Sequence, residues 1–191
     1  MITDKDRSYY IGASDVSYVM GSWDTPTFAK WWMVKLGVLT NSFTTEAMEA
    51  GNAYEHPILD ALNIPGLQKD AQIIKGRLRV NLDGSTDDCI YEVKTYKAGK
   101  AFKPTQNYIR QVNVQMYITG LRKAYIVSYG LTPEDYKCHH NPIDPRRIAY
   151  HKMRYDRRFI AQFEKRLLYL SECLEEKKHP DINEFLSRKE I

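Results

Sequence analysis

The chain has 191 residues, of which 43% are hydrophobic and 12% aromatic, and its formal net charge at pH 7 is +4. This composition is that of a globular protein rather than a disordered one, and the length suits a single domain over residues 1–191. It contains no apolar run of about 18 residues, which excludes a membrane span, and we find no signal peptide after Met1.

The number and spacing of the cysteines bear on the cellular compartment. There are three of them, Cys89, Cys138 and Cys173, far apart and in no C-x-x-C pair. An odd, scattered set excludes a disulfide framework and a four-cysteine metal site within one chain. We therefore expect a cytoplasmic protein without membrane association.

The first part of the chain favours helices. A short helix is predicted to begin at Ser14 or its neighbour and to end at Gly21, and a second is predicted over residues 25–37. The free N–H groups of a helix start can bind phosphate, although most serine caps are only caps. Trp31 and Trp32 could stack on bases, but aromatic residues at helical spacing are more often core, and we assign them to the core.

A third helix is predicted over residues 44–62. Pro57 should kink it or restart it, because proline removes a backbone donor and clashes with the preceding turn. Glu55 borders the apolar stripe of this helix, and alone it would be an ordinary surface glutamate.

A hairpin occupies the middle of the chain. Strands are predicted over residues 71–75 and 77–82, and a third over 89–95 follows a loop rich in glycine, serine and aspartate. Asp83 should stand at the end of the second strand. Side chains alternate along a strand, so Glu92 and Lys94 share one face while Val93 points to the other.

Two carboxylates and an ammonium would therefore converge near Asp83. Hard oxygen ligands hold Mg²⁺ or Mn²⁺, and such an ion can activate water against a phosphodiester. The alternative is that Glu92 and Lys94 form a solvated surface pair, which is the commoner role of such residues on a strand.

The second half of the chain alternates helices and strands. A helix over residues 105–119 carries Gln111 and Gln115 side by side. It is followed by a strand over 123–128, a loop over 132–145, a strand over 146–154, and an amphipathic helix over 155–178 with Arg157, Arg158, Lys165 and Arg166 outward. The whole pattern predicts an α/β fold with a mixed central β-sheet flanked by helices.

The charge is unevenly distributed. No Asp or Glu occurs from Val93 through Pro133, whereas that stretch carries Lys94, Lys97, Lys100, Lys103, Arg110, Arg122 and Lys123. A basic segment directly after a candidate metal site suits a polyanionic substrate. The alternative is a basic surface that is only solvated.

Taken together, these residues resemble a known nuclease group. The motifs are Gly51-x-x-x-Glu55, Leu82-Asp83-Gly84, Glu92-Val93-Lys94 and Gln111-Val-x-x-Gln115-Met, with an opening Arg7…Ile-Gly-Ala-Ser14. In this order they resemble the PD-(D/E)XK nuclease superfamily, and within it the lambda-type exonuclease or YqaJ-like viral recombinase group. The resemblance covers nearly the whole chain and implies a restriction-endonuclease-like core.

The resemblance also implies roles for the site residues. Asp83, Glu92 and the backbone carbonyl of Val93 would bind the first Mg²⁺, for which Mn²⁺ should substitute. Glu55 would join through a second ion or a bound water. Lys94 would orient the attacking water and help to deprotonate it, and Gln111 would help to position it.

A 5′-phosphate pocket is implied as well. Arg7, Ser14, Asn81 and Lys100 would contact the terminal phosphate or nearby DNA. Asn81 stands where the lambda-type enzyme has a serine and Lys100 where it has an arginine, while Leu82 replaces the proline before the aspartate. These departures affect the phosphate pocket more than the metal site.

The function implied is a Mg²⁺-dependent 5′→3′ exonuclease that digests linear double-stranded DNA and leaves 3′ single-stranded tails for phage-type homologous recombination. A homotrimer, a single-strand annealing protein as partner, and a phage or prophage gene acting in the cytoplasm of a bacterial host are implied with it. Two alternatives stay open: an endonuclease or repair nuclease of the same superfamily, and a catalytically silent DNA-end-binding module.

Overall fold

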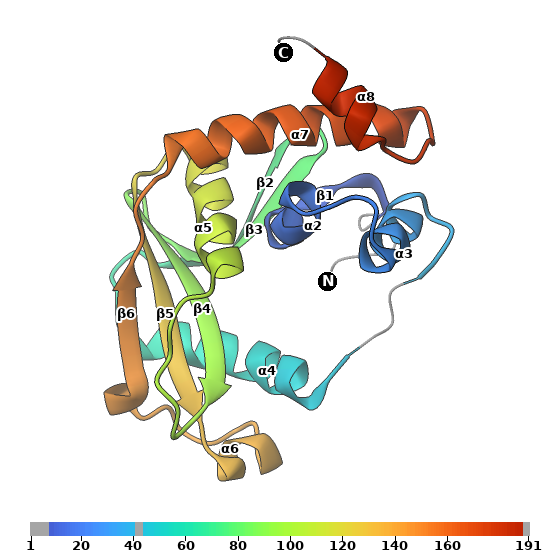
Figure 1. Ribbon diagram of the computed structural model, residues 1–191. Helices are drawn as coiled ribbons and strands as arrows, with labels where there is room; N and C mark the ends of the chain where they lie inside the picture. The colour runs from blue at the N-terminus through green and yellow to red at the C-terminus, as the bar shows by residue number, and fades with distance from the viewer. Residues whose placement is uncertain (1–7, 41–43, 189–191) are drawn as a thin grey trace. The chain divides into compact units, whose positions relative to one another are not determined.

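The chain folds into a six-stranded mixed β-sheet with helices around it (Figure 1). The computed structural model describes residues 8–40 and 44–188. The strands are β1 (Ile11–Gly12), β2 (Gln68–Lys75), β3 (Leu78–Ser85), β4 (Cys89–Lys97), β5 (Lys123–Leu131) and β6 (Ile148–Lys152). The helices are η1 (Ala13–Asp15), α2 (Val16–Met20), α3 (Pro26–Lys35), α4 (Glu46–Ala61), α5 (Gln106–Thr119), α6 (Pro133–Lys137), η2 (Pro145–Arg147), α7 (Arg157–Glu175) and α8 (Ile182–Ser187). The predicted α/β class with a mixed sheet is therefore confirmed.

The strands follow the order β1-β3-β4-β5-β6, and β2 pairs with β3 outside this path. The β3–β4 and β5–β6 pairs are antiparallel, whereas β1–β3 and β4–β5 are parallel. A parallel pair needs a crossover, and α5 provides it between β4 and β5. As a result, the residues of β4 that face α5 are covered by the helix that directly follows them in the chain.

Two compact units divide the chain. The central unit takes residues 43–73 and 81–155, and the terminal unit takes the segments up to residue 42, 74–80 and from 156 onward. Each is discontinuous in sequence, since β2 and β3 contribute to both. The single-domain expectation for residues 1–191 stays a prediction.

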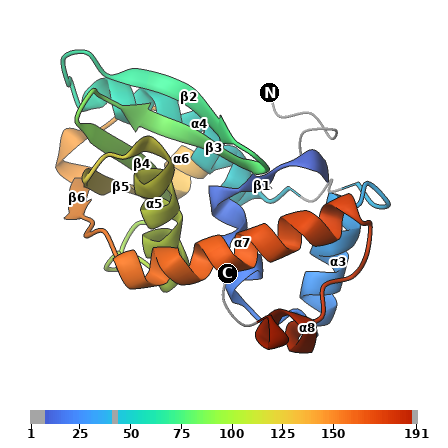
Figure 2. The same cartoon turned by 90° about the horizontal axis from the view of Figure 1, so that it is seen from above.

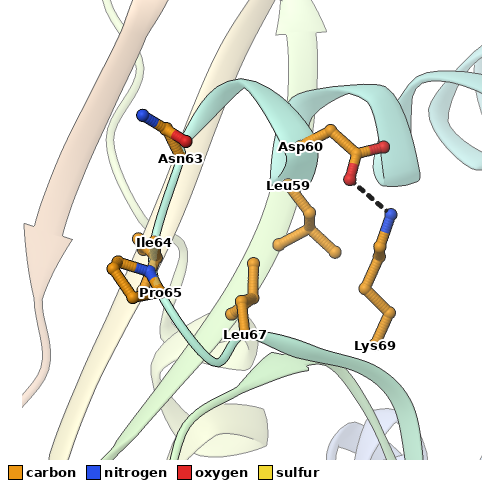
Figure 3. A pocket seen from close by; sticks show the side chains of 7 residues that line it. All are labelled: Leu59, Asp60, Asn63, Ile64, Pro65, Leu67 and Lys69. Atoms are coloured by element: carbon orange, nitrogen blue, oxygen red, sulfur yellow. Dashed lines mark hydrogen bonds and ion pairs between the residues drawn. The ribbon is translucent and has the colours of Figure 1, made fainter.

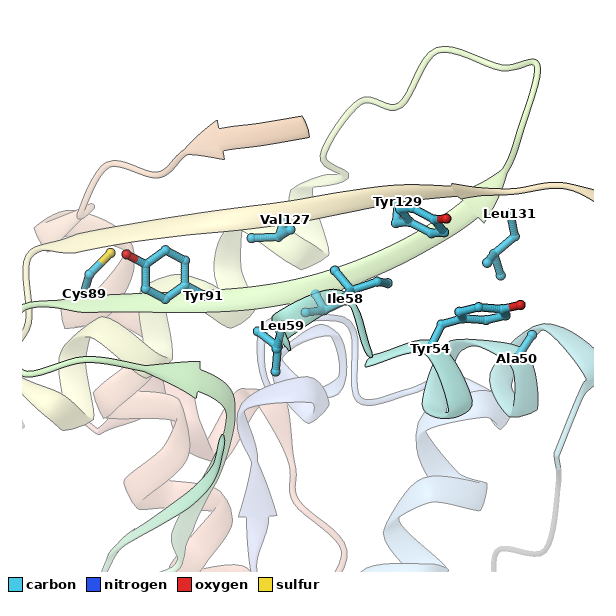
Figure 4. Packing of buried hydrophobic residues seen from close by; sticks show 10 residues of the cluster. Ala50, Tyr54, Ile58, Leu59, Cys89, Tyr91, Val127, Tyr129 and Leu131 are labelled. Carbon is cyan, nitrogen blue, oxygen red and sulfur yellow. The ribbon is translucent and has the colours of Figure 1, made fainter. Parts of the chain in front are cut away.

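The core of the central unit lies between α4 and one face of β4 and β5 (Figure 4). Tyr54, Ile58 and Leu59 of α4 are buried there against Val93 of β4 and Val127 of β5. Burying side chains of this size contributes roughly 1.5–3 kcal/mol each. The position of Val93 in this core confirms the predicted alternation along β4.

Thr44 and Thr45 were both candidates to cap helix α4, and Thr45 does so: its Oγ1 accepts a hydrogen bond from Met48 N–H at 3.2 Å. The predicted restart of the helix at Pro57 is wrong, because α4 runs continuously from Glu46 to Ala61. A kink at Pro57 stays a prediction. An interior proline costs about 3 kcal/mol. Burial of Tyr54 and Ile58, on either side of the proline, offsets that cost.

The hairpin differs from the prediction in where β3 ends. We expected the strand to stop at Leu82, but it continues through Asp83 to Ser85, and Gly84 pairs with Tyr91. Gly84 acts here as a packing residue rather than a turn former. A Cβ at this position would stand 2.8 Å from Leu59 Cδ2, so only glycine lets α4 approach this closely.

The terminal unit is built on aromatic packing. Trp32 and Trp23 are almost fully buried, and Trp31 is nearly so, which confirms that the α3 tryptophans belong to the core. Trp23 stacks on Tyr169 of α7 with ring centroids 5.4 Å apart. Figure 2 shows α8 beside α7, where Tyr169 Oη donates to the carbonyl of Asp181 at 3.0 Å.

One helix prediction for this unit is confirmed and one expectation is corrected. The helix predicted to begin at Ser14 or its neighbour begins at the neighbour, because Asp15 occupies the N-cap position of α2, Gly21 follows its end, and Ser14 itself lies in η1. Arg166 does not point outward: its Nη1 donates to the carbonyls of Val19 and Gly21, both at 2.9 Å. These carbonyls end α2, so the half-buried Arg166 satisfies acceptors that a helix end leaves open.

A short helix interrupts a segment that we predicted as a loop, and another lies beyond the last predicted element. The predicted loop over 132–145 contains α6, which begins with a capping box at Thr132, and α8 follows the end of α7. Within the described residues, no helix has the length and apolar character needed to cross a membrane.

Candidate active site

Glu92 is the centre of the candidate site. It lies on the face of β4 opposite to Val93 and is only 1% exposed. Its Oε1 accepts hydrogen bonds from Lys94 Nζ and from Gln111 Nε2, both at 2.6 Å. Its Oε2 accepts one from Gln115 Nε2 at 2.5 Å. A carboxylate this buried costs several kcal/mol to desolvate, and these three donors offset that cost.

Asp83 lies on the neighbouring strand β3, and its side chain contacts the backbone of β4. Its Oδ2 accepts a hydrogen bond from Val93 N–H at 2.8 Å. The pKa of Asp83 is raised well above its ordinary value by burial, and further by the charges of Glu92 and Glu55. Asp83 and Glu92 therefore meet as neighbouring acids across the antiparallel pair.

Glu55 extends from α4 toward the same charges. Burial and the nearby Glu92 raise its pKa. Its carboxylate also gathers with His56 and Asp70, since one ligand atom from each of the three lies within 4.8 Å of the others. His56 Nε2 and Asp70 Oδ2 are 2.9 Å apart, and both side chains are exposed.

Lys94 carries the positive charge of the site. Burial alone would lower its pKa, but the charges of Glu92 and Asp83 outweigh burial and raise it. Its Nζ also stands 5.1 Å from the ring centre of Tyr108 on α5. In this arrangement Lys94 is an ammonium held against Glu92.

The donor set suits a divalent cation with oxygen ligands. Glu55, Asp83 and Glu92 lie close enough for the charges of its neighbours to raise the pKa of Glu55 and of Asp83, and one lysine does not neutralise all three acids. A dication would relieve this repulsion, and carboxylates are the ligands that Mg²⁺ and Mn²⁺ prefer. His56 would add a nitrogen ligand on the side of Glu55, which Mn²⁺ accepts more readily than Mg²⁺.

The structure brings only some of the sequence-predicted residues together. Gln111 contacts Glu92 directly. Asn81 is exposed on β3, two residues before Asp83, and its Oδ1 accepts from Gln72 Nε2 at 3.2 Å. Lys100 is exposed beyond β4, in the segment that leads to α5. Ser14 belongs to the terminal unit, and Arg7 lies outside the described residues.

Sequence reasoning assigned no role to Gln115 or to Tyr108. Both lie on α5, Tyr108 three residues before Gln111 and Gln115 four residues after it. Helical spacing from Gln111 is therefore the signal that could have identified them. His56 was also missed, although it directly follows Glu55.

A pocket of about 350 Å³ lies elsewhere in the central unit (Figure 3). It is formed by the end of α4 and the start of β2, and its lining residues are Leu59, Asp60, Asn63, Ile64, Pro65, Leu67 and Lys69. Asp60 Oδ1 is paired with Lys69 Nζ at 2.6 Å. The predicted site residues are not among these lining residues, so we do not place the chemistry here.

Comparison with known proteins finds likeness at the level of structure. No protein-family model matches the chain, and no curated protein matches it. An alkaline exonuclease, LHK-Exo from Laribacter hongkongensis, is similar with a TM-score of 0.69 and 21% identity, covering 97% of both chains. Its complex with dAMP is similar with a TM-score of 0.68 and 22% identity, covering 95% of this chain and 93% of that one.

A phage-related exonuclease from Haemophilus somnus 129PT is similar with a TM-score of 0.63 and 15% identity, covering 91% of this chain and 97% of that one. These likenesses show that the chain has the restriction-endonuclease-like fold of such exonucleases over almost its whole length. They agree with the resemblance drawn from the motifs.

Proposed function

We propose that this protein is a metal-dependent deoxyribonuclease that digests linear double-stranded DNA 5′→3′ and leaves 3′ single-stranded tails for phage-type recombination. The observation that carries the proposal is the cluster of Glu55, Asp83 and Glu92 with Lys94. Solved exonucleases of the same fold support it, one of them in complex with dAMP.

The proposed site residues divide the work of phosphodiester hydrolysis. Glu55, Asp83, Glu92 and the Val93 carbonyl would hold Mg²⁺, or Mn²⁺ in its place, as two ions. When bound, the ions supply neutralisation of the phosphate oxygens and of the leaving oxyanion. Gln111 and Gln115 hold Glu92 in one orientation, so that its carboxylate need not reorganise during the reaction.

Lys94 would act on the water. As an ammonium it orients a water molecule or stabilises negative charge that develops on the phosphate. It can accept a proton only if the pull of Glu92 and Asp83 on its pKa is offset, and cations held by those carboxylates would offset it. The role of Lys94 is thus tied to the state of the acids that surround it.

Arg7, Ser14, Asn81 and Lys100 are our proposed contacts to the 5′-phosphate and the adjacent DNA. A guanidinium grips a terminal phosphate with two parallel hydrogen bonds, which is the reason to place Arg7 first among them. A homotrimer and a single-strand annealing protein complete the proposal, in the cytoplasm of a bacterial host that carries the phage or prophage gene.

The experiment compares two DNA substrates of the same sequence in Mg²⁺. One is an end-labelled linear duplex with 5′-phosphates, and the other is a covalently closed circle. We expect the linear duplex to be shortened from its 5′ ends and the circle to stay intact. Cleavage of the circle would favour an endonuclease, and end binding without cleavage would favour a silent module.

Two aspartate variants provide the control. Asp83→Asn should abolish cleavage because it removes an anionic ligand, while binding of the duplex persists. Asp87→Asn makes the same chemical change at an exposed position in the β3–β4 turn and should cleave like the wild type. Full activity of Asp83→Asn would rule out the assigned site.

A further inference from the structure

Three aromatic rings line the segment that connects the candidate active site to α5. The rings of Tyr96 and Phe102 have centroids 5.2 Å apart, and those of Phe102 and Tyr108 are 6.5 Å apart and nearly parallel, at 9°. Phe102 also contacts the His151 ring of β6 at 5.0 Å. We call Tyr96, Phe102 and Tyr108 the aromatic surface.

Backbone and side-chain contacts hold this surface in place. The Tyr96 ring lies against Gly130, where an added Cβ would stand 3.3 Å from its Cζ. His151 is held by Ser128, with Nε2 and Oγ 2.9 Å apart. The rings therefore have a fixed foundation on β5 and β6, which favours a preformed binding surface.

The aromatic surface differs from the core in its exposure. Core tyrosines such as Tyr54 and Tyr129 are fully buried, whereas Tyr96, Phe102 and Tyr108 are each partly open to solvent. Packing of the sheet does not require partly open rings in a row. Burial by a partner would account for them.

The charge around these rings identifies the kind of partner. Lys97, Lys100 and Lys103 are exposed within the same segment, and the chain has no Asp or Glu from Val93 through Pro133. Tyr108 also lies under Lys94 Nζ, so the surface begins at the candidate active site. Lysines interspersed with rings are the pattern that binds a strand whose phosphates meet the lysines and whose bases stack on the rings.

We propose that the aromatic surface stacks unpaired bases at the end of the DNA strand whose phosphates approach the active site. The proposal rests on the nuclease function above and adds to it a binding site for single-stranded deoxyribonucleotides. A duplex with a frayed or unpaired end would then engage more readily than one with a closed end.

The test measures binding without cleavage, by fluorescence anisotropy in EDTA. One probe is a 5′-phosphorylated single-stranded oligonucleotide, and the other has the same length and charge but abasic sites near its 5′ end. We expect the wild type to bind the first more tightly. Phe102→Leu, which keeps an apolar side chain but removes the ring, should weaken binding of the first probe on the order of tenfold and leave the abasic probe unchanged.

Two further variants serve as controls. Phe102→Tyr keeps a ring and should bind like the wild type. Phe159→Leu makes the same change as Phe102→Leu at another partly exposed phenylalanine, in the terminal unit, and should have no effect. Equal affinity of the wild type for the two probes would overturn the proposal even if Phe102→Leu did not fold, and so would an equal loss by Phe102→Leu on both.

These results also separate the proposal from the nuclease function. Base-dependent binding by a protein that does not cleave linear duplex would refute only the proposed function. Cleavage with no difference between the two probes would refute only the aromatic surface.

Discussion

The side chain of Gln115 is fully buried, and its hydrogen bond is to Glu92. Its Nε2 donates to Glu92, while its buried Oε1 has no hydrogen-bond partner among the described residues. Only the amide nitrogen can donate to a carboxylate, so this contact sets the orientation of the amide. Leaving Oε1 unpaired costs free energy, so we infer that the hydrogen bond to Glu92 contributes more than that cost.

We therefore predict that Gln115→Leu loses roughly 1–3 kcal/mol of stability, because it leaves a buried carboxylate oxygen without its donor. Cleavage should also slow, since Glu92 is no longer held in one orientation. Chemical denaturation and initial rates measure the two effects. Gln162→Leu, at an exposed position on α7, is the matched control, and a Gln115→Leu protein as stable as that control would contradict the role.

At the scale of elements, Gly84 of β3, next to Asp83, is a point at which α4 packs closely against the strand. Gly84→Ala should destabilise the protein by about 1–3 kcal/mol, because the new methyl group would overlap the buried Leu59. The additional variant Leu59→Ala makes room for that methyl group. In denaturation experiments the double variant should thus lose less than the two single variants summed, and strict additivity would show that the contact is not responsible.

A second element contact fixes α6 and η2 to the core. Asp135 is buried, and Arg147 Nη1 donates to its Oδ2 at 2.5 Å. Thr132 N–H and Asn141 Nδ2 donate to the same carboxylate. Burial opposes ionisation, but the donors, Arg147 foremost, outweigh it and lower the pKa of Asp135 to about 2.

This shift predicts a dependence of stability on pH. A lowered pKa stabilises the fold above the ordinary value of 3.8, and the stabilisation is lost as the pH falls toward about 2. Its size at neutral pH is on the order of 2 kcal/mol. Asp135→Asn should lose stability at pH 7 but differ little from the wild type near pH 2. Denaturation at both values checks this, and a loss independent of pH would point to packing instead.

The elements that sequence predicted well are those whose determinants are local. The alternation along β4 and the helices predicted over residues 25–37 and 105–119 depend on residues within one or two turns, and each is confirmed. Gly84 and Arg166 were misjudged because their partners, Leu59 and Val19, are distant in the chain. No local pattern distinguishes a turn glycine from one that a helix packs against.

The same reasoning applies to the candidate site. The strand period predicted that Glu92 and Lys94 share a face, and they do. Gln115 was assigned no role, because a glutamine on a helix is usually a surface residue. Only the fold shows that a buried carboxylate lies opposite it. The approach of Glu55 to the strand acids came from motif resemblance, since no periodicity links α4 to β4.

At the scale of the whole molecule, the open question is how a chain of 191 residues would stay on DNA through repeated cleavage. One such chain is too small to encircle a duplex, so sustained digestion needs a ring of copies or repeated rebinding. The motif resemblance implies a ring. A closed trimer would use a heterologous interface, in which two different patches meet around a threefold axis.

We predict that light scattering gives three times the mass of one chain at working concentrations. A trimer that encloses its DNA should also keep digesting a labelled duplex after excess unlabelled duplex is added, because it does not dissociate between steps. An enzyme that rebinds would stop labelled digestion at once under the same challenge. A monomeric mass together with uninterrupted digestion would contradict the ring and require a single chain to retain its substrate unaided.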